Sequence, residues 1–227
     1  MVQELFITAD GSHSVRAVLP GSAVSVSYHS THGALAESRE VFIQPGLGWV
    51  LQAFANAEIS VLEIGLGTGL NALLTALECG RQRRHVRYTA LELYPLEPAL
   101  AAALNYPALL GEGHNVLRAI HETRWSSLTA ITPFFSIEKL MQDAVADALL
   151  PGPHHLIYLD AFSPEEQPML WTEEMFRRLR AVLHIGGALV TYCSKSVVRR
   201  AMVAAGFRVE KLPGPRGKRE MVRAIAV

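Results

Sequence analysis

The sequence predicts an α/β fold with a mostly parallel central sheet, and two observations carry that prediction. From Ser60 onward, apolar runs alternate with segments of helical periodicity. The runs are apolar at successive positions, which is typical of parallel strands covered by helices on both faces. The last two runs follow one another with only a turn through Gly214, Pro215 and Gly217 between them. We therefore expect an antiparallel hairpin at the sheet edge.

Five strand-and-helix units are expected before that hairpin. In chain order they are SVLEIG (60–65) with a helix from about Leu70, VRYTALE (86–92) with PLEPALAAAL (95–104), FFSIEKL (134–140) with a short helix, HHLIYLD (154–160) with WTEEMFRRLRAVL (171–183), and GALVTYC (187–193) with KSVVRRAMVAAG (195–206). The hairpin itself is FRVEKLP (207–213) followed by EMVRAIAV (220–227).

The N-terminal residues predict a small β appendage. Within residues 4–27, the segments LFIT and VRAVL flank Asp10 and Gly11, a dipeptide suited to a tight turn between strands. We assign residues 1–50 to this N-terminal β-hairpin appendage with a substrate-pocket segment, and residues 51–227 to the α/β domain.

Length and composition fit one domain. Half of the 227 residues are hydrophobic, and 21 basic residues balance 21 acidic ones, so net charge neither predicts nor excludes a polyanionic partner. Cys79 and Cys193 each lie in an apolar segment, which predicts buried thiols in a reducing compartment. The N-terminus lacks the pattern of a secretory signal, and no stretch is long enough to span a bilayer. We expect a soluble, cytoplasmic protein.

The strongest functional signal is a glycine-rich turn between the first long buried strand and its helix. Residues 61–71 read VLEIGLGTGLN. Glycines let the backbone turn tightly and approach a ligand, and the first amides of the helix can meet an anionic group. In α/β sheets, nucleotides bind in the crevice at the carboxyl ends of the strands. The candidate cofactor-binding residues here are Glu63, Gly65, Gly67, Gly69 and Asn71.

Two acidic residues at later strand ends complete the predicted cofactor site. Glu92 ends the second strand, where its carboxylate can accept hydrogen bonds from both ribose hydroxyls. NAD would satisfy the same geometry, but the dinucleotide fingerprint wants glycine where Leu70 stands, and the terminal hairpin is foreign to the usual dinucleotide sheet. These features favour S-adenosyl-L-methionine. Asp143 follows the third strand, placed either to bind the adenine amino group or to serve as a solvated helix cap.

Asp160 is the candidate catalytic residue. Its strand delivers it to the same end of the sheet, and Phe162 and Pro164 follow it closely. These three side chains can hold a planar base that carries an amine, because the carboxylate orients the nitrogen and the ring packs on the base. An ionised Asp160 also stabilises the ammonium form, which is not nucleophilic, so the site must keep the amine neutral when it reacts. The structural alternative for Asp160 is a turn cap.

Four segments carry a family resemblance. They are YHSTHGALAESREVF (28–42), GLGTGLN (65–71), LDAFSP (159–164) continuing through MLWT to Phe176, and GKREM (217–221). In these segments the chain resembles the tRNA 5-aminomethyl-2-thiouridine methyltransferase family, which comprises the methyltransferase domain of MnmC and its stand-alone MnmD-like form. The resemblance covers nearly the whole chain and implies a Rossmann-like class I methyltransferase that uses S-adenosyl-L-methionine.

The reaction that this resemblance implies converts 5-aminomethyl-(2-thio)uridine at the tRNA wobble position to 5-methylaminomethyl-(2-thio)uridine. By position, Asp160 would hold the acceptor amine, and Tyr28 and Glu37 would line the substrate pocket with Phe162 and Pro164. Residues 132–152 match the family loosely, so Asp143 is preferred to Glu138 from strand length alone. No FAD-binding oxidase domain follows in the sequence, so we do not expect the step that removes a carboxymethyl group.

Other enzyme classes stay open at this stage. A methyltransferase for a small-molecule amine would need the same cofactor site and no basic surface. An aminopropyltransferase or a dehydrogenase would use the same crevice with a different cofactor. A catalytically silent nucleotide-binding module is the last alternative, although the intact Asp160 argues against it.

The C-terminal region concentrates positive charge. From Lys195 to the end, nine basic residues stand against two acidic ones, and phosphate contacts from such a region would make binding strongly salt-dependent. With the family resemblance, Arg199, Arg200, Lys218 and Arg219 are the candidate tRNA-binding residues; without it, a solvated face is the better interpretation.

The histidines and Trp171 are assigned no role in the chemistry. The nine histidines lack the spacing of a metal site, so no metal is predicted. Trp171 opens an amphipathic segment and is expected in the core. No oligomer is predicted.

Overall fold

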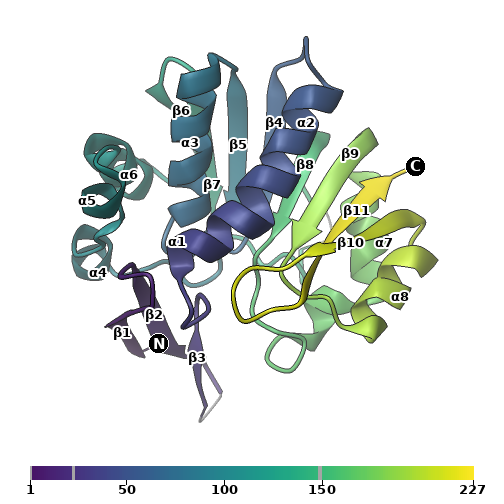
Figure 1. The fold of residues 1–227 in the computed structure, drawn as a ribbon, viewed down its shortest axis with the longest axis horizontal. Helices are drawn as coiled ribbons and strands as arrows, with labels where there is room; N and C mark the ends of the chain where they lie inside the picture. Colours follow the sequence, from purple (N-terminus) through teal and green to yellow (C-terminus); the bar gives the residue numbers. More distant parts are fainter. Residues whose placement is uncertain (1, 22–23, 148–149) are drawn as a thin grey trace.

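A mostly parallel sheet forms the centre of the molecule (Figure 1). The computed structural model describes residues 2–21, 24–147 and 150–227, and among these the sheet has eight strands in the order β10-β11-β9-β8-β4-β5-β7-β6. The pairs β9-β8, β8-β4, β4-β5 and β5-β7 are parallel, and the pairs toward both edges are antiparallel. The predicted α/β class and the antiparallel C-terminal hairpin are confirmed.

The strand boundaries follow the apolar runs of the sequence. The strands of the sheet are β4 (Ile59–Ile64), β5 (Val86–Leu91), β6 (Thr129–Thr132), β7 (Phe135–Leu140), β8 (His154–Leu159), β9 (Leu183–Thr191), β10 (Phe207–Pro213) and β11 (Glu220–Ala226). The main covering helices are α3 (Leu70–Gln82), α7 (Glu173–Ala181) and α8 (Ser196–Ala204), with a short 3₁₀ turn, η2 (Pro168–Trp171), before α7.

Helices cover the sheet on both faces, which explains why its central strands are apolar at successive positions. Val61 lies in a core cluster with Val50 and with Leu73 of α3. The next residue, Leu62, lies in a second cluster with Phe176 of α7. Because successive side chains of a strand point to opposite faces, a strand covered on both sides must be apolar throughout.

A three-stranded sheet forms the predicted N-terminal appendage. It consists of β1 (Val2–Ile7), β2 (His13–Val18) and β3 (Ser25–Ser27), with β2 paired antiparallel to both neighbours. The turn between β1 and β2 contains Gly11 at φ 82° and is closed by the Asp10 carboxylate, which accepts the backbone N–H of Ser12. The side-chain oxygen of Asn105 accepts the backbone N–H of His13 at 2.8 Å, which ties the appendage to the larger domain.

A continuous helical segment connects the appendage to the central sheet. It runs through α1 (Ala34–Glu37), a π-helical stretch η1 (Ser38–Leu47) and α2 (Gly48–Ala53). Figure 1 shows this segment lying across the sheet next to α3. Gly46 permits the close approach, because a Cβ there would lie 2.9 Å from Val190 and 3.3 Å from Leu156. The division proposed at residue 50 falls inside α2 and stays a prediction.

The region between β5 and β8 differs most from expectation. The predicted helix at 95–104 is only α4 (Pro98–Ala102), and α5 (Tyr106–Leu110), α6 (His114–Glu122) and β6 were not predicted. Left-handed glycines at 111 and 113 divide this region into pieces too short to show a clear period. The short helix predicted after β7 is absent from residues 141–147, of which 144–146 form a turn, and residues 148–149 lie outside the described part.

Candidate functional site

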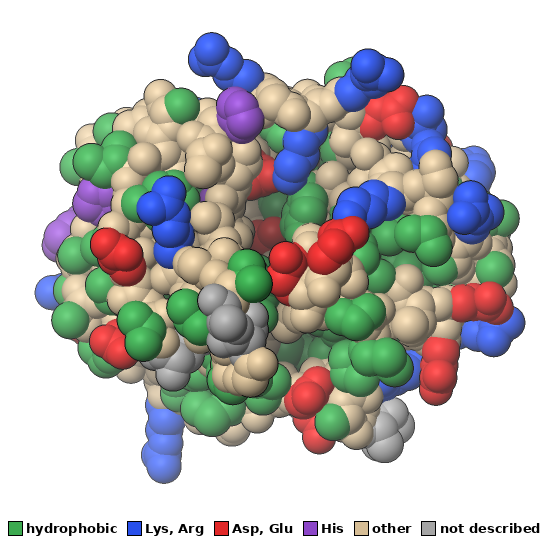
Figure 2. All heavy atoms as spheres, turned by 90° about the horizontal axis from the view of Figure 1, so that it is seen from below, with side chains coloured by type: hydrophobic (Ala, Val, Ile, Leu, Met, Phe, Trp, Pro, Cys, Tyr) green, Lys and Arg blue, Asp and Glu red, His purple; other side chains and the backbone are tan. Residues whose placement is uncertain are grey.

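A cavity of about 570 Å³ opens at the carboxyl ends of β4, β5 and β8. Its walls come from the glycine turn, from residues 25–32 of the appendage, from residues 160–167 and from the turn before β11. Figure 2 looks into this hollow, with acidic side chains deep inside and Lys and Arg side chains gathered along part of its mouth. The predicted location of the site is therefore a real cavity.

The glycine turn has a backbone that only glycine adopts readily. Gly65, Gly67 and Gly69 have φ angles of 91°, 53° and 72°. A Cβ on Gly65 would lie 2.7 Å from the backbone oxygen of Asp160, so this turn and the end of β8 must touch through bare backbone. The turn leads directly into α3, as predicted; Gly65 and Gly67 line the cavity, whereas Gly69 is not among its lining residues.

Glu92 holds the glycine turn from the neighbouring strand end. One carboxylate oxygen accepts the N–H of Gly67 at 2.9 Å, and the other accepts the N–H of Tyr94 at 2.7 Å. Burial raises the pKa of Glu92, and the backbone donors oppose that shift. Each carboxylate oxygen retains a lone pair, so Glu92 can still accept hydrogen bonds from a ligand.

Asp143 lines the cavity, whereas Glu138 does not. One Asp143 oxygen accepts the N–H groups of Val145 (2.8 Å) and Ala146 (3.2 Å), so the residue also caps its own turn. Glu138 lies within β7, and its carboxylate is 3.9 Å from the Arg87 guanidinium. Between the two, the geometry favours Asp143 as a ligand-facing residue.

Asn71 links two carboxyl groups at the floor of the site. Its side-chain N–H₂ donates to Asp160 at 2.8 Å and to Glu63 at 3.0 Å. Glu63 is fully buried and is not among the cavity-lining residues, so it supports Asn71 from behind. Burial and the charge of Asp160 raise the pKa of Glu63 well above its usual range. Glu63 was predicted as a cofactor contact, and the structure places it one layer deeper.

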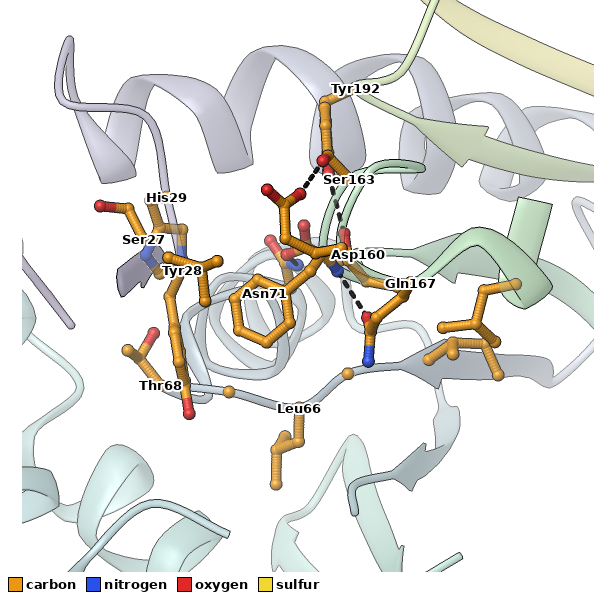
Figure 3. Close-up of a pocket in the computed structure, with 18 of the residues that line it drawn as sticks. Ser27, Tyr28, His29, Leu66, Thr68, Asn71, Asp160, Ser163, Gln167 and Tyr192 are labelled. Atoms are coloured by element: carbon orange, nitrogen blue, oxygen red, sulfur yellow. Dashed lines mark hydrogen bonds between the residues drawn. The ribbon is translucent and has the colours of Figure 1, made fainter. Parts of the chain in front are cut away.

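Asp160 faces the cavity with a strongly altered acidity. Desolvation by burial, followed by the negative charge of Glu37, raises its pKa to about 8, although the Asn71 hydrogen bond and Lys218 act in the opposite direction. Figure 3 shows Asp160 and Asn71 close to Tyr28, above the turn that carries Leu66 and Thr68. Within the described part of the chain, the Asp160 carboxylate accepts a hydrogen bond from Asn71 and none from a turn amide, so the structural alternative of a turn cap finds no support.

Aromatic rings line the same cavity as Asp160. Tyr28 and Phe162 meet edge to face with ring centroids 5.3 Å apart. Trp171 is buried, as predicted, and its indole N–H donates to the backbone oxygen of Phe162 at 2.9 Å, which fixes the loop after β8. Pro164 follows in the same loop but is not a cavity-lining residue. Tyr192, at the end of β9, lines the cavity and was not predicted.

Glu37 and Lys218 meet across the cavity. Lys218 Nζ lies 2.6 Å from one Glu37 oxygen, and the other oxygen accepts the backbone N–H of Ser30 at 2.7 Å. The Glu37 side chain is 7% exposed and that of Lys218 is 31% exposed. Lys218 Nζ also lies 3.9 Å from the centre of the Tyr192 ring. Lys218, predicted as a tRNA contact, therefore lies in the cavity.

The other candidate tRNA-binding residues lie on the outer surface. Arg199 is on α8, 24% exposed, with its guanidinium 3.8 Å from the Glu220 carboxylate. Arg200 follows it on the same helix, and Arg219 lies in the turn before β11; both are exposed. Two of the four predicted cations are therefore already paired with carboxylates.

The described residues contain neither a metal-binding cluster nor a membrane-spanning helix. There, no three His, Cys, Asp or Glu side chains gather in a way that could hold a metal ion. Among the helices in the same residues, none combines the length and the apolarity required for a membrane span. The described thiols of Cys79 and Cys193 are buried and free.

Comparisons with known proteins agree with this geometry. Residues 138–226 match a family model described as S-adenosyl-L-methionine-dependent methyltransferase. The chain is 31% identical over 214 residues to the tRNA 5-methylaminomethyl-2-thiouridine biosynthesis bifunctional protein MnmC of Cupriavidus metallidurans, and 33% identical over 216 residues to that of Pseudomonas fluorescens. These matches cover 87% and 86% of this chain but only 31% of each relative, so the chain spans about a third of the length of the curated relatives that it matches.

A solved structure shows the same fold. MnmC2 from Aquifex aeolicus superposes with a TM-score of 0.80 at 24% identity, over 100% of this chain and 70% of that one. The Rossmann-like fold with its terminal hairpin is thus confirmed by a structure that shares only about a quarter of its residues with this chain.

Proposed function

We propose that the chain is an S-adenosyl-L-methionine-dependent methyltransferase, since it is similar over most of its length to part of the MnmC proteins, and that it methylates the amine of 5-aminomethyl-(2-thio)uridine at the tRNA wobble position. The product would be 5-methylaminomethyl-(2-thio)uridine. The observation that carries this proposal is the carboxylate of Asp160, held by Asn71 and flanked by Tyr28 and Phe162 beside the glycine turn. A substrate of this kind would place the protein in the cytoplasm with tRNA.

The glycine side of the cavity fits the cofactor. The backbone of Gly65 and Gly67 would face its polar tail, Glu92 its ribose and Asp143 its adenine. Asn71 would lie between this part and the acceptor site. Its side-chain oxygen is buried and has no hydrogen-bond partner among the described residues.

Asp160 is suited to make the acceptor nucleophilic. A primary alkylammonium must lose a proton before its nitrogen can attack, and a carboxylate with a pKa of about 8 is matched to take that proton near neutral pH. The ammonium becomes a neutral amine and Asp160 becomes a carboxylic acid. The nitrogen lone pair then forms the new N–C bond, which yields a secondary ammonium. When bound, S-adenosyl-L-methionine supplies a methyl group on a positively charged sulfur, and the sulfur departs with the C–S electron pair as a neutral thioether.

A methyl-transfer assay tests the proposal directly. Protein and labelled donor are incubated with tRNA from cells that lack the activity, and the nucleosides are then separated. We expect label in 5-methylaminomethyl-(2-thio)uridine and none with Asp160→Asn. Transfer to another nucleoside, or to none, would contradict the proposed substrate.

A small-molecule amine is the alternative acceptor. The observation that favours it is the internal pairing of Lys218 and Arg199, which leaves fewer free cations for a polyanion than the sequence predicts. The same assay with small amines at low and high salt separates the two, because only tRNA methylation should fall steeply as salt is added.

A further inference from the structure

The Lys218 ammonium occupies a subsite built for a cation. It extends from the turn at 214–219 into the cavity, where it meets Glu37 at 2.6 Å and the Tyr192 ring at 3.9 Å. A carboxylate and an aromatic face are the two partners that best bind an alkylammonium in a desolvated place. In the free protein, the alkylammonium group of Lys218 contacts both of these partners.

The partners of Lys218 are fixed independently of it. The second Glu37 oxygen is held by the Ser30 N–H at 2.7 Å, so the carboxylate keeps its orientation when the lysine leaves. The Tyr192 hydroxyl donates to the backbone oxygen of Ala161 at 2.9 Å, and Trp171 packs on its edge. The ring is therefore anchored to the residue that follows Asp160. A subsite that persists without its occupant can take another one.

We propose that Glu37 and the face of Tyr192 form the recognition site for the positively charged nitrogen of the acceptor, and that Lys218 is an internal occupant which this nitrogen displaces. The proposal rests on the proposed function, because it requires an acceptor with an aliphatic amine. It assigns a specificity-determining role to Glu37 and Tyr192 and a gating role to Lys218.

Charge balance supports an exchange of one ammonium for another. Glu37 and Asp160 are two carboxyl groups close enough for the charge of Glu37 to raise the pKa of Asp160. A carboxylate that is 7% exposed is costly to leave unpaired, so a cation is needed near Glu37 both in the free protein and when the acceptor binds. A substrate ammonium that replaces Lys218 keeps the charge of the site constant. It also brings the nitrogen next to Asp160, which then removes its proton.

The turn that carries Lys218 offers the displaced side chain a place at the outer surface. This turn is closed by a hydrogen bond from the Lys218 N–H to Pro215 at 2.8 Å, and it carries the exposed Arg216 and Arg219 on either side. Once outside the cavity, Lys218 would join these two cations at the mouth, where a nucleotide phosphate would lie. Lys218 would then lie in the cavity in the free protein and contact tRNA in the complex.

Binding of free nucleosides tests the exchange without any need for tRNA. The affinities of 5-aminomethyluridine and of uridine are measured calorimetrically with S-adenosylhomocysteine present, for the native protein, Lys218→Met and Lys211→Met. Lys211 is an exposed lysine of the same hairpin, paired with Glu220, and serves as the matched control. Removal of the internal occupant should strengthen binding of 5-aminomethyluridine by about fivefold or more, because no competing ammonium has to leave.

Three further results are expected. Lys218→Met should leave uridine binding unchanged, Lys211→Met should change neither affinity, and Glu37→Gln should abolish the preference for 5-aminomethyluridine over uridine. Equal or weaker binding of 5-aminomethyluridine by Lys218→Met would overturn the proposal.

A crystal structure of the native protein with 5-aminomethyluridine is a second test that needs no variant. Lys218 Nζ should no longer contact Glu37 in that complex, and a retained contact would refute displacement. Failure of tRNA methylation alone would contradict the proposed function. The nucleoside-binding results would still test the displacement of Lys218, because they do not depend on tRNA.

Discussion

The side-chain amide of Asn71 donates to the Asp160 carboxylate at 2.8 Å and to the Glu63 carboxyl group at 3.0 Å, so one residue at the start of α3 orients the proposed base. This contact connects the two halves of the site. The glycine turn that positions Asn71 is the same turn proposed to hold the cofactor, and Asp160 faces the acceptor. A change at Asn71 should therefore alter the chemistry as well as the binding.

Asn71→Leu should shift the pH dependence of methyl transfer toward alkaline pH. The amide hydrogen bond stabilises the ionised form of Asp160, so its loss raises the pKa of Asp160 further above about 8. Less carboxylate is then available at neutral pH, and kcat should fall by roughly 10- to 100-fold. The pH profile of kcat distinguishes this effect from simple misfolding. Asn115→Ala, on the surface of α6, is the matched control and should leave the profile unchanged. An unshifted profile in Asn71→Leu would show that Asn71 does not tune the base.

Asp160→Asn should make the free energy of unfolding less dependent on pH. The folded-state pKa of about 8 exceeds the ordinary value of 3.8, so the native state binds a proton that the unfolded state releases between these values. The contribution of Asp160 to stability is therefore present below pH 3.8 and is lost as pH rises through 8. We expect the free energy of unfolding of the native protein to fall by a few kcal/mol more than that of Asp160→Asn between pH 5 and pH 8.5. Urea denaturation at several pH values measures it, and parallel curves for the two proteins would contradict the raised pKa.

The sequence could predict the sheet, the glycine turn and Asp160, because each leaves a local signal. Apolar runs mark strands buried on both faces, and alternating glycines mark a backbone with positive φ angles that glycine adopts most readily. Contacts between distant segments leave no such signal. Glu37 and Lys218 are 181 positions apart, and nothing in either neighbourhood shows that they meet.

Glu63 and Tyr192 are two further differences between the sequence analysis and the structure. Glu63 was assigned to the cofactor because it stands in the glycine motif, yet the alternation of side chains along β4 sends it into the interior. Tyr192 was overlooked because a tyrosine at the end of an apolar run resembles any core residue. Only the assembled fold brings its ring to the cavity, beside the loop that follows β8.

Asp143→Ala should weaken cofactor binding, and Glu138→Ala should not. Asp143 lines the cavity, so removal of its carboxylate takes away the acceptor proposed for the adenine amino group and also one cap of its turn. A loss of roughly 10-fold in affinity for S-adenosylhomocysteine is expected, which corresponds to about 1.4 kcal/mol for a lost hydrogen bond. Glu138 lies beside Arg87 on β7 and is the matched acidic control. Equilibrium binding decides, and an unchanged affinity in Asp143→Ala would remove Asp143 from the cofactor site.

The exposed cations of α8 and of the terminal turn should control the salt dependence of tRNA binding. Arg200 and Arg219 are exposed, whereas Arg199 already lies near Glu220. Each phosphate contact that is lost lowers the slope of log affinity against log salt concentration by about 0.9 for duplex-like and about 0.7 for single-stranded contacts. The double variant Arg200→Glu and Arg219→Glu should therefore bind tRNA more weakly at low salt and respond less steeply to added salt. Arg177→Glu, on the exposed face of α7 where Arg177 pairs with Glu173, is a control of equal charge change per site and should leave the slope nearly unaltered. Equal slopes for the double variant and the native protein would place the tRNA surface elsewhere on the molecule. Nucleoside binding by the same variant is the control for the acceptor pocket, and unchanged binding would show that the pocket had stayed intact.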